Sequence, residues 1–378
     1  MLDNRTILRI YGEEYKENTK KILEKAGLEE LIPSKDKRIL IKPNLVSPTP
    51  ASFGATTHPE VVAGLVEYLQ EKGFTNIVIA EGSWVGDKTS ESVDVCGYLP
   101  IFEEYGVEFI DTQLDTWHPV QCGDMELNVC DCVKGDDYII NVPVLKGHCQ
   151  TSVTCALKNM KGLIPNPEKR RFHSMGLHKP IGLLQMAIPQ DFILVDHICG
   201  DPYIEDGGHP LVKNCIMAAT DPVLVDALVC KVLGYEVSDV PYIKVAEDAG
   251  AGSSNLSGAS IVSYDGEMNV LEGDPEGVIS SGDRLLETKD AVEEVESCSA
   301  CYGSLIPALE RLREEGLLSK LDETIRIGQG FRGKTGELGV GDCTGEFNFC
   351  IHGCPPDEDD IYAELKDYIN KKSQGIRR

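Results

Sequence analysis

Short apolar runs alternate with helical patterns through the first two thirds of the chain. Residues 38–46 and 76–80 are nearly continuous apolar runs, which is typical of strands buried on both faces. Between them, the sequence Thr57-His-Pro-Glu60 matches a capping box and opens a helical pattern that stops at Gly73. A strand, a helix and a strand at this spacing form a right-handed crossover between parallel strands. We therefore predict an α/β fold with a largely parallel sheet flanked by helices.

The same patterns predict the remaining elements. Further strands are expected at residues 137–144, 191–198, 215–219 and 324–327. Helices are expected at residues 221–233, 241–249, 304–315 and 357–370, and residues 151–161 are helical in character. The turn-rich loop at residues 200–210 has the length of a functional loop.

Polar side chains follow three of the predicted strands. Lys42 and Asn44 end the first strand, Glu81 ends the second, and Lys146 and His148 follow the third. Because the carboxyl ends of parallel strands meet at the edge where such sheets bind ligands, we expect these side chains to lie close together.

A basic segment contrasts with the acidic composition of the chain, whose formal net charge is -26. From Lys146 to Lys179 the chain carries one acid, Glu168, and the basic residues Lys146, Lys158, Lys161, Lys169, Arg170, Arg171 and Lys179. Such a local concentration of positive charge fits a pocket for a small carboxylate or phosphate. The alternative is a solvated, salt-bridged loop.

Composition narrows the class of protein. The chain has 378 residues, of which 42% are hydrophobic and 26% charged, as in globular proteins with two or three domains. Its apolar runs are shorter than a membrane span, and residues 1–5 contain no apolar signal core. A pI near 4.7 argues against nucleic-acid binding. We expect a cytoplasmic protein that binds neither membranes nor nucleic acid.

The 14 cysteines separate into two groups. Cys96, Cys199, Cys215 and Cys230 stand singly in apolar surroundings and are interpreted as small core residues. Cys298, Cys301, Cys343, Cys350 and Cys354 lie together in the last quarter of the chain. In a reducing compartment, such a group favours metal binding over disulfides.

The spacing within the second group predicts a metal centre. Cys298 and Cys301 form a Cys-x-x-Cys pair, and Cys343 and Cys354 each lie beside glycine, where the backbone can approach a bulky cofactor. Four thiolates suit a [4Fe-4S] cluster or structural zinc. We favour the cluster, because Gly353-Cys-Pro-Pro356 resembles the cluster-binding turn of hydrogenase small subunits. The expected ligands are Cys298, Cys301, Cys343 and Cys354, and Cys350 in place of Cys343 is the alternative.

Several motifs together resemble one family. They are Lys42-Pro-Asn44, Leu145-Lys146, Ala156-Leu-Lys-Asn-Met-Lys-Gly162, His173, Val195-Asp196 and Ala219-Thr-Asp-Pro-Val-Leu-Val-Asp226. They are similar to the domain of unknown function 362 family, over roughly residues 5–260. The resemblance implies the fold and a site, and members are often fused to an iron-sulfur segment. The commonest such segment resembles a two-cluster ferredoxin, for which the cysteines here are too few and too widely spread.

These expectations combine into a domain plan and a function. We expect an α/β domain with the anion site at residues 1–265, a connection at residues 266–292 and a small iron-sulfur domain at residues 293–378. The anion would be bound by Lys42, Asn44, Lys146, Lys158, Asn159 and Lys161. His173, His148 and Glu81 are the candidate acid-base groups.

The first hypothesis is a redox enzyme in which a [4Fe-4S] cluster exchanges electrons with a small anionic substrate or a redox partner protein. The second is a non-catalytic electron carrier or cluster-bearing interaction protein. The third is a cluster-dependent lyase. A homodimer is a further candidate partner arrangement.

Overall fold

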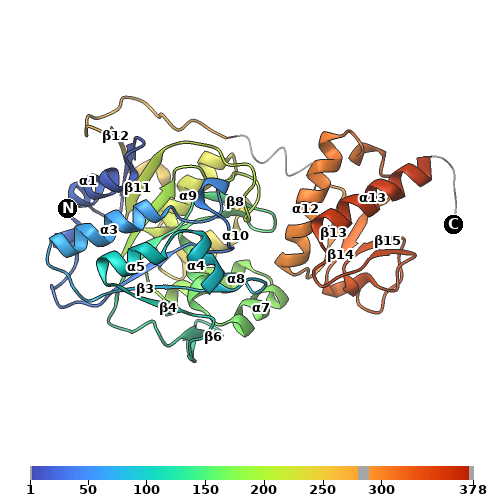
Figure 1. Ribbon diagram of the computed structural model, residues 1–378, viewed down its shortest axis with the longest axis horizontal. Coiled ribbons are helices and arrows are strands. Elements are labelled where there is room, and N and C mark those ends of the chain that lie inside the picture. The colour runs from blue at the N-terminus through green and yellow to red at the C-terminus, as the bar shows by residue number, and fades with distance from the viewer. Residues whose placement is uncertain (1, 280–287, 289, 374–378) are drawn as a thin grey trace. The chain divides into compact units, whose positions relative to one another are not determined.

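The computed structural model describes residues 2–279, 288 and 290–373 (Figure 1). The chain divides into two compact units, residues 1–172 with 177–279 and residues 280–378 with 173–176. The connection predicted at residues 266–292 falls partly on residues 280–287 and 289, which lie outside the described residues.

An eight-stranded sheet forms the centre of the first unit, in the order β12-β1-β11-β10-β7-β2-β3-β4. Its strands are β1 (Thr6–Tyr11), β2 (Ile39–Pro43), β3 (Ile77–Glu81), β4 (Glu108–Asp111), β7 (Tyr138–Val142), β10 (Phe192–His197), β11 (Cys215–Ala219) and β12 (Ser260–Asp265). Strand β11 runs antiparallel to both neighbours, and the other adjacent pairs are parallel. The predicted α/β class with a largely parallel, helix-flanked sheet is confirmed.

Helices and two hairpins surround this sheet. The helices are α1 (Tyr15–Ala26), α2 (Leu28–Leu31), α3 (Pro59–Glu71), α4 (Thr89–Val95), α5 (Leu99–Tyr105), α6 (Ala156–Asn159), α7 (Asn166–Met175), α8 (His178–Ala187), α9 (Pro222–Leu233) and α10 (Pro241–Asp248). The hairpins pair β5 (Trp117–Cys122) with β6 (Met125–Cys130) and β8 (Lys146–His148) with β9 (Ser152–Thr154).

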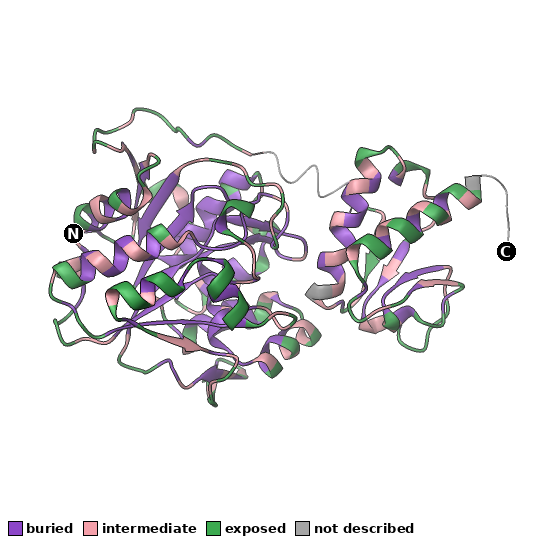
Figure 2. Cartoon of the chain, in the orientation of Figure 1, coloured by how far each residue is buried: buried purple, intermediate pink, exposed green. Residues whose placement is uncertain are grey.

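The core explains why these strands read as unbroken apolar runs. Every residue of β2, β3, β7, β10 and β11 is buried. Figure 2 shows the buried strands inside the first unit, with exposed residues on the outer sides of the helices that cover it. A strand covered on both faces needs apolar residues at successive positions rather than at alternate ones.

The prediction of a capping box at Thr57 was wrong. Helix α3 begins at Pro59 with His58 at the N-cap, and no side chain caps it. The Thr57 hydroxyl instead donates to the Val142 carbonyl and accepts from the backbone N–H of Asn44, both at 2.8 Å. This hydroxyl therefore joins the ends of β2 and β7.

The helix predicted at residues 151–161 is much shorter. The backbone of Ser152 has a positive φ of 65°, and Ser152–Thr154 pairs with β8 as strand β9. Only Ala156–Asn159 is α-helical, and Met160–Leu163 continues as a 3₁₀ turn. The Asp226 carboxylate fixes the start of α6, because it accepts the backbone N–H groups of Ala156 and Leu157 at 2.7 and 3.2 Å.

The second unit has its own parallel sheet, in the order β13-β14-β15-β16. Its elements are β13 (Val292–Glu294), α12 (Ser299–Glu314), β14 (Ile325–Ile327), β15 (Leu338–Val340), β16 (Phe349–Ile351) and α13 (Glu358–Ser373). The two long helices pack together and bury Leu305, Leu309, Ile361 and Leu365.

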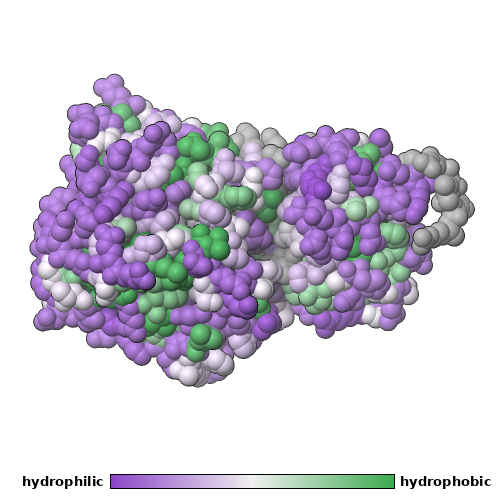
Figure 3. All heavy atoms as spheres, viewed as in Figure 1, coloured by the Kyte–Doolittle hydropathy of each residue, from purple (hydrophilic) through white to green (hydrophobic). Residues whose placement is uncertain are grey.

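The face shown in Figure 3 is largely hydrophilic, as expected for a chain with 98 acidic and basic residues. Hydrophobic residues on this face form scattered groups. Within the described part of the chain, no helix combines the length and the apolar character that crossing a bilayer requires.

Candidate functional site

Lys42 and Glu81 form a buried ion pair between the carboxyl ends of β2 and β3. The ammonium of Lys42 also donates to the Pro43 carbonyl at 2.7 Å, and Glu81 Oε1 accepts the Gly82 N–H at 2.7 Å. Burial lowers the pKa of Lys42, and the charge of Glu81 opposes this shift. Lys42 therefore has an internal anion as its partner.

Gly162 packs directly on this ion pair. A Cβ atom at Gly162 would lie 1.9 Å from Glu81 Oε1 and 2.5 Å from Lys42 Nζ, so no side chain fits there. The Gly162 carbonyl also accepts a 2.6 Å hydrogen bond from the Thr112 hydroxyl. The glycine that ends the Leu-Lys-Asn-Met-Lys-Gly segment thus lets that segment lie against the sheet edge.

Buried polar side chains hold the same segment in place. Asn159 Nδ2 lies 2.7 Å from Asn141 Oδ1 and donates to the Lys42 carbonyl at 3.3 Å. Asn141 in turn donates to the Ala156 carbonyl at 2.8 Å. Burial raises the pKa of Asp226, the carboxylate that caps α6, to about 7. Asn159 therefore holds the Leu-Lys-Asn-Met-Lys-Gly segment against β2 and β7.

Lys146 is also buried and bound by protein atoms. Its ammonium donates to the carbonyls of Ala55 and Glu205, both at 2.6 Å. Burial lowers the pKa of Lys146 to about 8, while Asp206 opposes that shift. These carbonyl contacts attach the loop at residues 200–210 to the segment that precedes α3.

Lys158 and Lys161 differ from the other two lysines. Lys158 Nζ has one hydrogen bond, to the Thr154 hydroxyl at 3.3 Å. Within the described residues, Lys161 has neither a hydrogen bond nor an ion pair for its ammonium. Burial lowers the pKa of both, and the charges of Lys158 and Lys169 lower that of Lys161 further. These two ammonium groups have donors left for an external anion.

Lys169 extends the basic region beyond the four predicted lysines. Its ammonium donates to the carbonyls of Gly82 and Ser83, both at 2.9 Å. Burial lowers the pKa of Lys169 to about 8, and the charge of Glu81 opposes this shift. Lys169 therefore adds positive charge beside Lys161 but has its own carbonyl partners.

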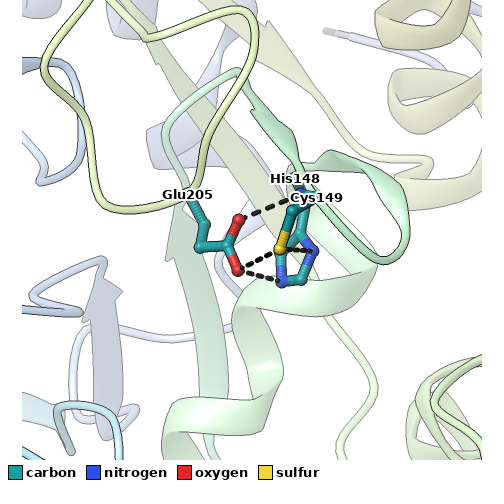
Figure 4. A group of neighbouring side chains, drawn as sticks. All are labelled: His148, Cys149 and Glu205. Carbon is teal, nitrogen blue, oxygen red and sulfur yellow. Dashed lines mark hydrogen bonds and ion pairs between the residues drawn. The ribbon is translucent and has the colours of Figure 1, made fainter. Parts of the chain in front are cut away.

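His148, Cys149 and Glu205 form a buried group in which one ligand-type atom of each lies within 4.8 Å of the others (Figure 4). Glu205 Oε1 lies 2.9 Å from Cys149 Sγ and 3.3 Å from His148 Nε2, and Glu205 Oε2 accepts the Cys149 N–H at 3.0 Å. Cys149 and Glu205 were not among the predicted site residues. The length of the loop at residues 200–210 was the available signal for Glu205.

These three residues are of the types that hold a divalent metal. In the arrangement shown, however, His148 Nδ1 accepts the backbone N–H groups of Gln150 and Thr151 at 3.0 and 3.3 Å. The proton of the neutral imidazole is therefore assigned to Nε2, which faces Glu205. The group is a hydrogen-bonded network whose carboxylate lies within electrostatic range of Lys158.

Two other predicted site residues have other surroundings. His173 lies half-buried in α7, within the short stretch at residues 173–176 that groups with the second unit. The Asn44 side chain accepts the Val46 N–H at 3.2 Å and so shapes its own turn.

In the second unit, four thiols follow the carboxyl ends of parallel strands. Cys298 and Cys301 follow β13 at the start of α12, Cys343 follows β15, and Cys354 follows β16. Burial, together with the charges of Cys298, Cys354 and Cys343, raises the pKa of Cys301 to about 12. The structure thus brings these four thiols close enough to interact electrostatically.

Cys350 lies inside strand β16 and has different neighbours. Its Sγ lies 3.5 Å from both the Thr344 hydroxyl and the Gly341 carbonyl. By contrast, Cys298 Sγ and Cys343 Sγ accept hydrogen bonds from Gln329 and Arg332, at 3.6 and 3.4 Å. Side-chain N–H donors therefore contact two of the four thiols that follow strand ends.

Comparisons with known proteins give limited similarity. Thylakoid-associated protein sll1697 of Synechocystis sp. is 25% identical over 225 residues, covering 56% of this chain and 68% of that protein. The lactate racemase apoprotein from Thermoanaerobacterium thermosaccharolyticum aligns with a TM-score of 0.40 and 12% identity, over 58% of this chain and 55% of that one. A crystal structure of a Thermotoga maritima protein aligns with a TM-score of 0.36 and 16% identity, over 64% of this chain and 60% of that one.

The chain thus spans a little over half the length of the solved structures it matches. A family model also matches the chain. It describes a domain of unknown function, DUF362, and matches residues 39–231, from β2 to α9. Because this match covers just over half of the 378 residues, the chain belongs to the DUF362 family.

Proposed function

We propose that this protein is an iron-sulfur redox enzyme that acts on a small carboxylate or phosphate. Its second unit would bind one [4Fe-4S] cluster through Cys298, Cys301, Cys343 and Cys354. The observation that carries the proposal is the placement of these four thiols at strand ends, with Cys350 held apart inside β16.

The donor set fits such a cluster. Four thiolates without a compensating cation would repel one another, and the raised pKa of Cys301 reflects this in part. Gly341 and Gly353 leave the surrounding backbone without side chains, and a Cβ atom at Gly341 would lie 3.7 Å from Cys301 Sγ. Gln329 and Arg332 supply N–H donors to sulfur, which is how proteins tune clusters of this kind.

We favour a cluster over zinc, because Gly353-Cys-Pro-Pro356 resembles the cluster-binding turn of hydrogenase small subunits. Structural zinc held by the same four thiolates is the alternative. Metal analysis of the purified protein distinguishes the two.

The anion site of the proposal is centred on Lys158 and Lys161. Both ammonium groups have donors left, whereas Lys42 and Lys146 are occupied by Glu81 and by backbone carbonyls. Two like charges held close together in protein favour binding of an anion between them. A bound cluster would supply one-electron transfer, and the lysines would bind and orient the anion.

Anaerobic purification followed by visible spectroscopy and by iron and sulfide analysis tests the cluster. We expect a coloured protein with close to four irons and four sulfides per chain, as the proposed cluster requires. A colourless protein that contains zinc would exclude both the redox enzyme and the electron carrier. Reduction of the cluster without any effect of small anions on the rate would favour the electron carrier instead.

The lyase alternative predicts a different ligand requirement. In that case one iron would lack a thiolate, so one of the four cysteine-to-serine variants would keep its cluster. Loss of the cluster in all four variants would exclude it.

A further inference from the structure

Cys199 was interpreted from the sequence as a small core residue, but the structure places it against a buried imidazole. Cys199 follows β10, and its Sγ lies 3.7 Å from His58 Nε2. His58 Nδ1 lies 2.8 Å from Asp196 Oδ2 at the end of the same strand. A thiol, an imidazole and a carboxylate in this order are the arrangement that activates nucleophiles in many enzymes.

The carboxylate is held rigidly. Asp196 is fully buried and also accepts the backbone N–H groups of His58 at 2.7 Å and of Ile198 at 3.0 Å. Burial alone would raise the pKa of Asp196, but the charge and hydrogen bond of His58 lower it below its ordinary value. Asp196 therefore stays ionised and fixes the orientation of the imidazole.

The imidazole carries a positive charge at neutral pH. Burial alone would lower the pKa of His58, but Asp196 raises it to about 10. A protonated imidazole beside a thiol is a setting in which cysteines become reactive. The ring of Tyr15 packs edge-on against the imidazole of His58, with 5.6 Å between the ring centroids, which further limits the motion of the imidazole.

We propose that Cys199 is a modification site at which His58 and Asp196 promote oxidation of the thiol by hydrogen peroxide. The sulfur attacks one peroxide oxygen, and the O–O bond breaks. The leaving hydroxide takes the Nε2 proton of His58 to become water. The thiol proton then passes to Nε2, so the imidazole is protonated again. One thiol and one peroxide thus yield one sulfenic acid and one water, with sulfur oxidised by two electrons and peroxide reduced.

The packing selects for a small, uncharged oxidant. Cys199 is 5% exposed, and its Sγ also lies 3.3 Å from the Ala51 carbonyl. A Cβ atom at Gly54 would lie 2.8 Å from the Cys199 carbonyl, so the backbone at residues 51–54 packs against both the thiol and the backbone of Cys199. The His58 side chain, whose Nε2 faces the thiol, is 12% exposed.

The same segment connects this thiol to the basic site. The Ala55 carbonyl, one residue after Gly54, accepts the 2.6 Å hydrogen bond from Lys146. Adding an oxygen to Cys199 would displace the backbone at residues 51–54 and so alter the support of Lys146. This inference rests only on the geometry of Cys199 and holds whether or not the second unit binds a cluster.

Cys96 provides an internal control. It is 4% exposed, nearly the same as Cys199, and its Sγ likewise lies close to a backbone carbonyl, that of Thr49 at 3.2 Å. Its hydrogen bonds are to the carbonyls of Ser47 and Thr49 and to the Thr56 side chain, and among the described residues none is to an imidazole. Cys96 and Cys199 therefore differ chiefly in the His58–Asp196 pair.

The test is to treat the purified full-length chain with hydrogen peroxide, trap sulfenic acid with dimedone and measure each cysteine peptide by mass spectrometry. We expect Cys199 to react at least about tenfold faster than Cys96, a modest fraction of what general acid catalysis supplies. In the His58→Gln variant, the Cys199 rate should fall by about tenfold or more.

Solvent access alone makes a different forecast for this variant. The glutamine amide reaches about as far as the imidazole Nε2 but carries no charge, so access alone would leave the Cys199 rate nearly unchanged. An unchanged or faster rate in His58→Gln, or equal rates for Cys199 and Cys96 in the unmodified protein, would overturn the proposal. The ratio in the unmodified protein requires no variant, and Asp196→Asn, which keeps the side-chain shape, provides a second test if His58→Gln fails to fold.

Discussion

The contrast between Lys42 and Lys161 gives the sharpest test of the basic site. Both are lysines near the same sheet edge, but Lys42 is paired with Glu81, whereas Lys161 has no such partner in the described residues. Methionine keeps the length and packing of a lysine stem and removes its charge. The two variants Lys42→Met and Lys161→Met should therefore change stability and binding in different ways.

For Lys42→Met we expect a large loss of stability. The change leaves the Glu81 carboxylate buried without its counterion, and breaking a buried pair in this way costs about 3–5 kcal/mol. For a unit of this size, each kcal/mol lowers the melting temperature by about 2–4 °C, so the expected decrease is about 6–20 °C.

For Lys161→Met we expect unchanged or higher stability without ligand. Burial and the charges of Lys158 and Lys169 disfavour the Lys161 ammonium, and the substitution removes that cost. Anion affinity should fall at least about tenfold, which corresponds to about 1.4 kcal/mol. Lys158→Met should lose affinity to a similar degree.

The assay is thermal unfolding of each variant, followed by circular dichroism, with and without inorganic phosphate and a panel of small carboxylates. A ligand that binds only the folded state raises its stability by about 2.7 kcal/mol at a concentration of 100 Kd. If Lys161→Met melts as low as Lys42→Met and its response to anions is unchanged, Lys161 is a structural residue and the anion site must be abandoned.

Two further predictions concern the cysteines and a buried carboxylate. Cys354→Ser should lose the visible absorption of the cluster and loosen the second unit, as loss of a structural metal does, while Cys350→Ser should retain both; the reverse pattern would exchange the ligands. Glu276 is buried with His197 Nε2 at 2.7 Å, and although burial alone would raise the pKa of Glu276, His197 lowers it from near 4.5 to about 2. Because the pKa in the folded state lies below that in the unfolded state, the stabilisation is complete above about pH 4.5 and is lost as the pH falls toward 2. Glu276→Gln should therefore lower the free energy of unfolding by about 3 kcal/mol at neutral pH. Urea unfolding at a series of pH values should also show a smaller loss of stability between pH 4.5 and 2 in this variant. An equal loss in both proteins would mean that other carboxylates cause it.

Much of the fold could be predicted because burial on both faces leaves a strong trace in the sequence. The predicted strand at residues 215–219 is β11, and the helix after Asp221 is α9, whose N-cap is the Asp221 carboxylate. The antiparallel direction of β11 was not predicted. An apolar run records that a strand is buried but not which way it runs between its neighbours.

The sequence by itself determined which residue types are available for chemistry, and near which strand ends. The position of Lys42 and Glu81 at two parallel strand ends was enough to predict that they would meet, and the glycine-flanked cysteines were enough to identify candidate ligands.

Only the tertiary structure decided which of these groups are already occupied. Whether a lysine faces a carboxylate, a carbonyl or neither depends on contacts between residues far apart in the chain, such as Lys146 with Ala55 or Asn159 with Lys42. For the same reason the sequence did not predict that Cys199 contacts an imidazole, because His58 lies 141 residues earlier in the chain. The energy of a buried charge depends on its partners in space, and no local pattern of residues records them.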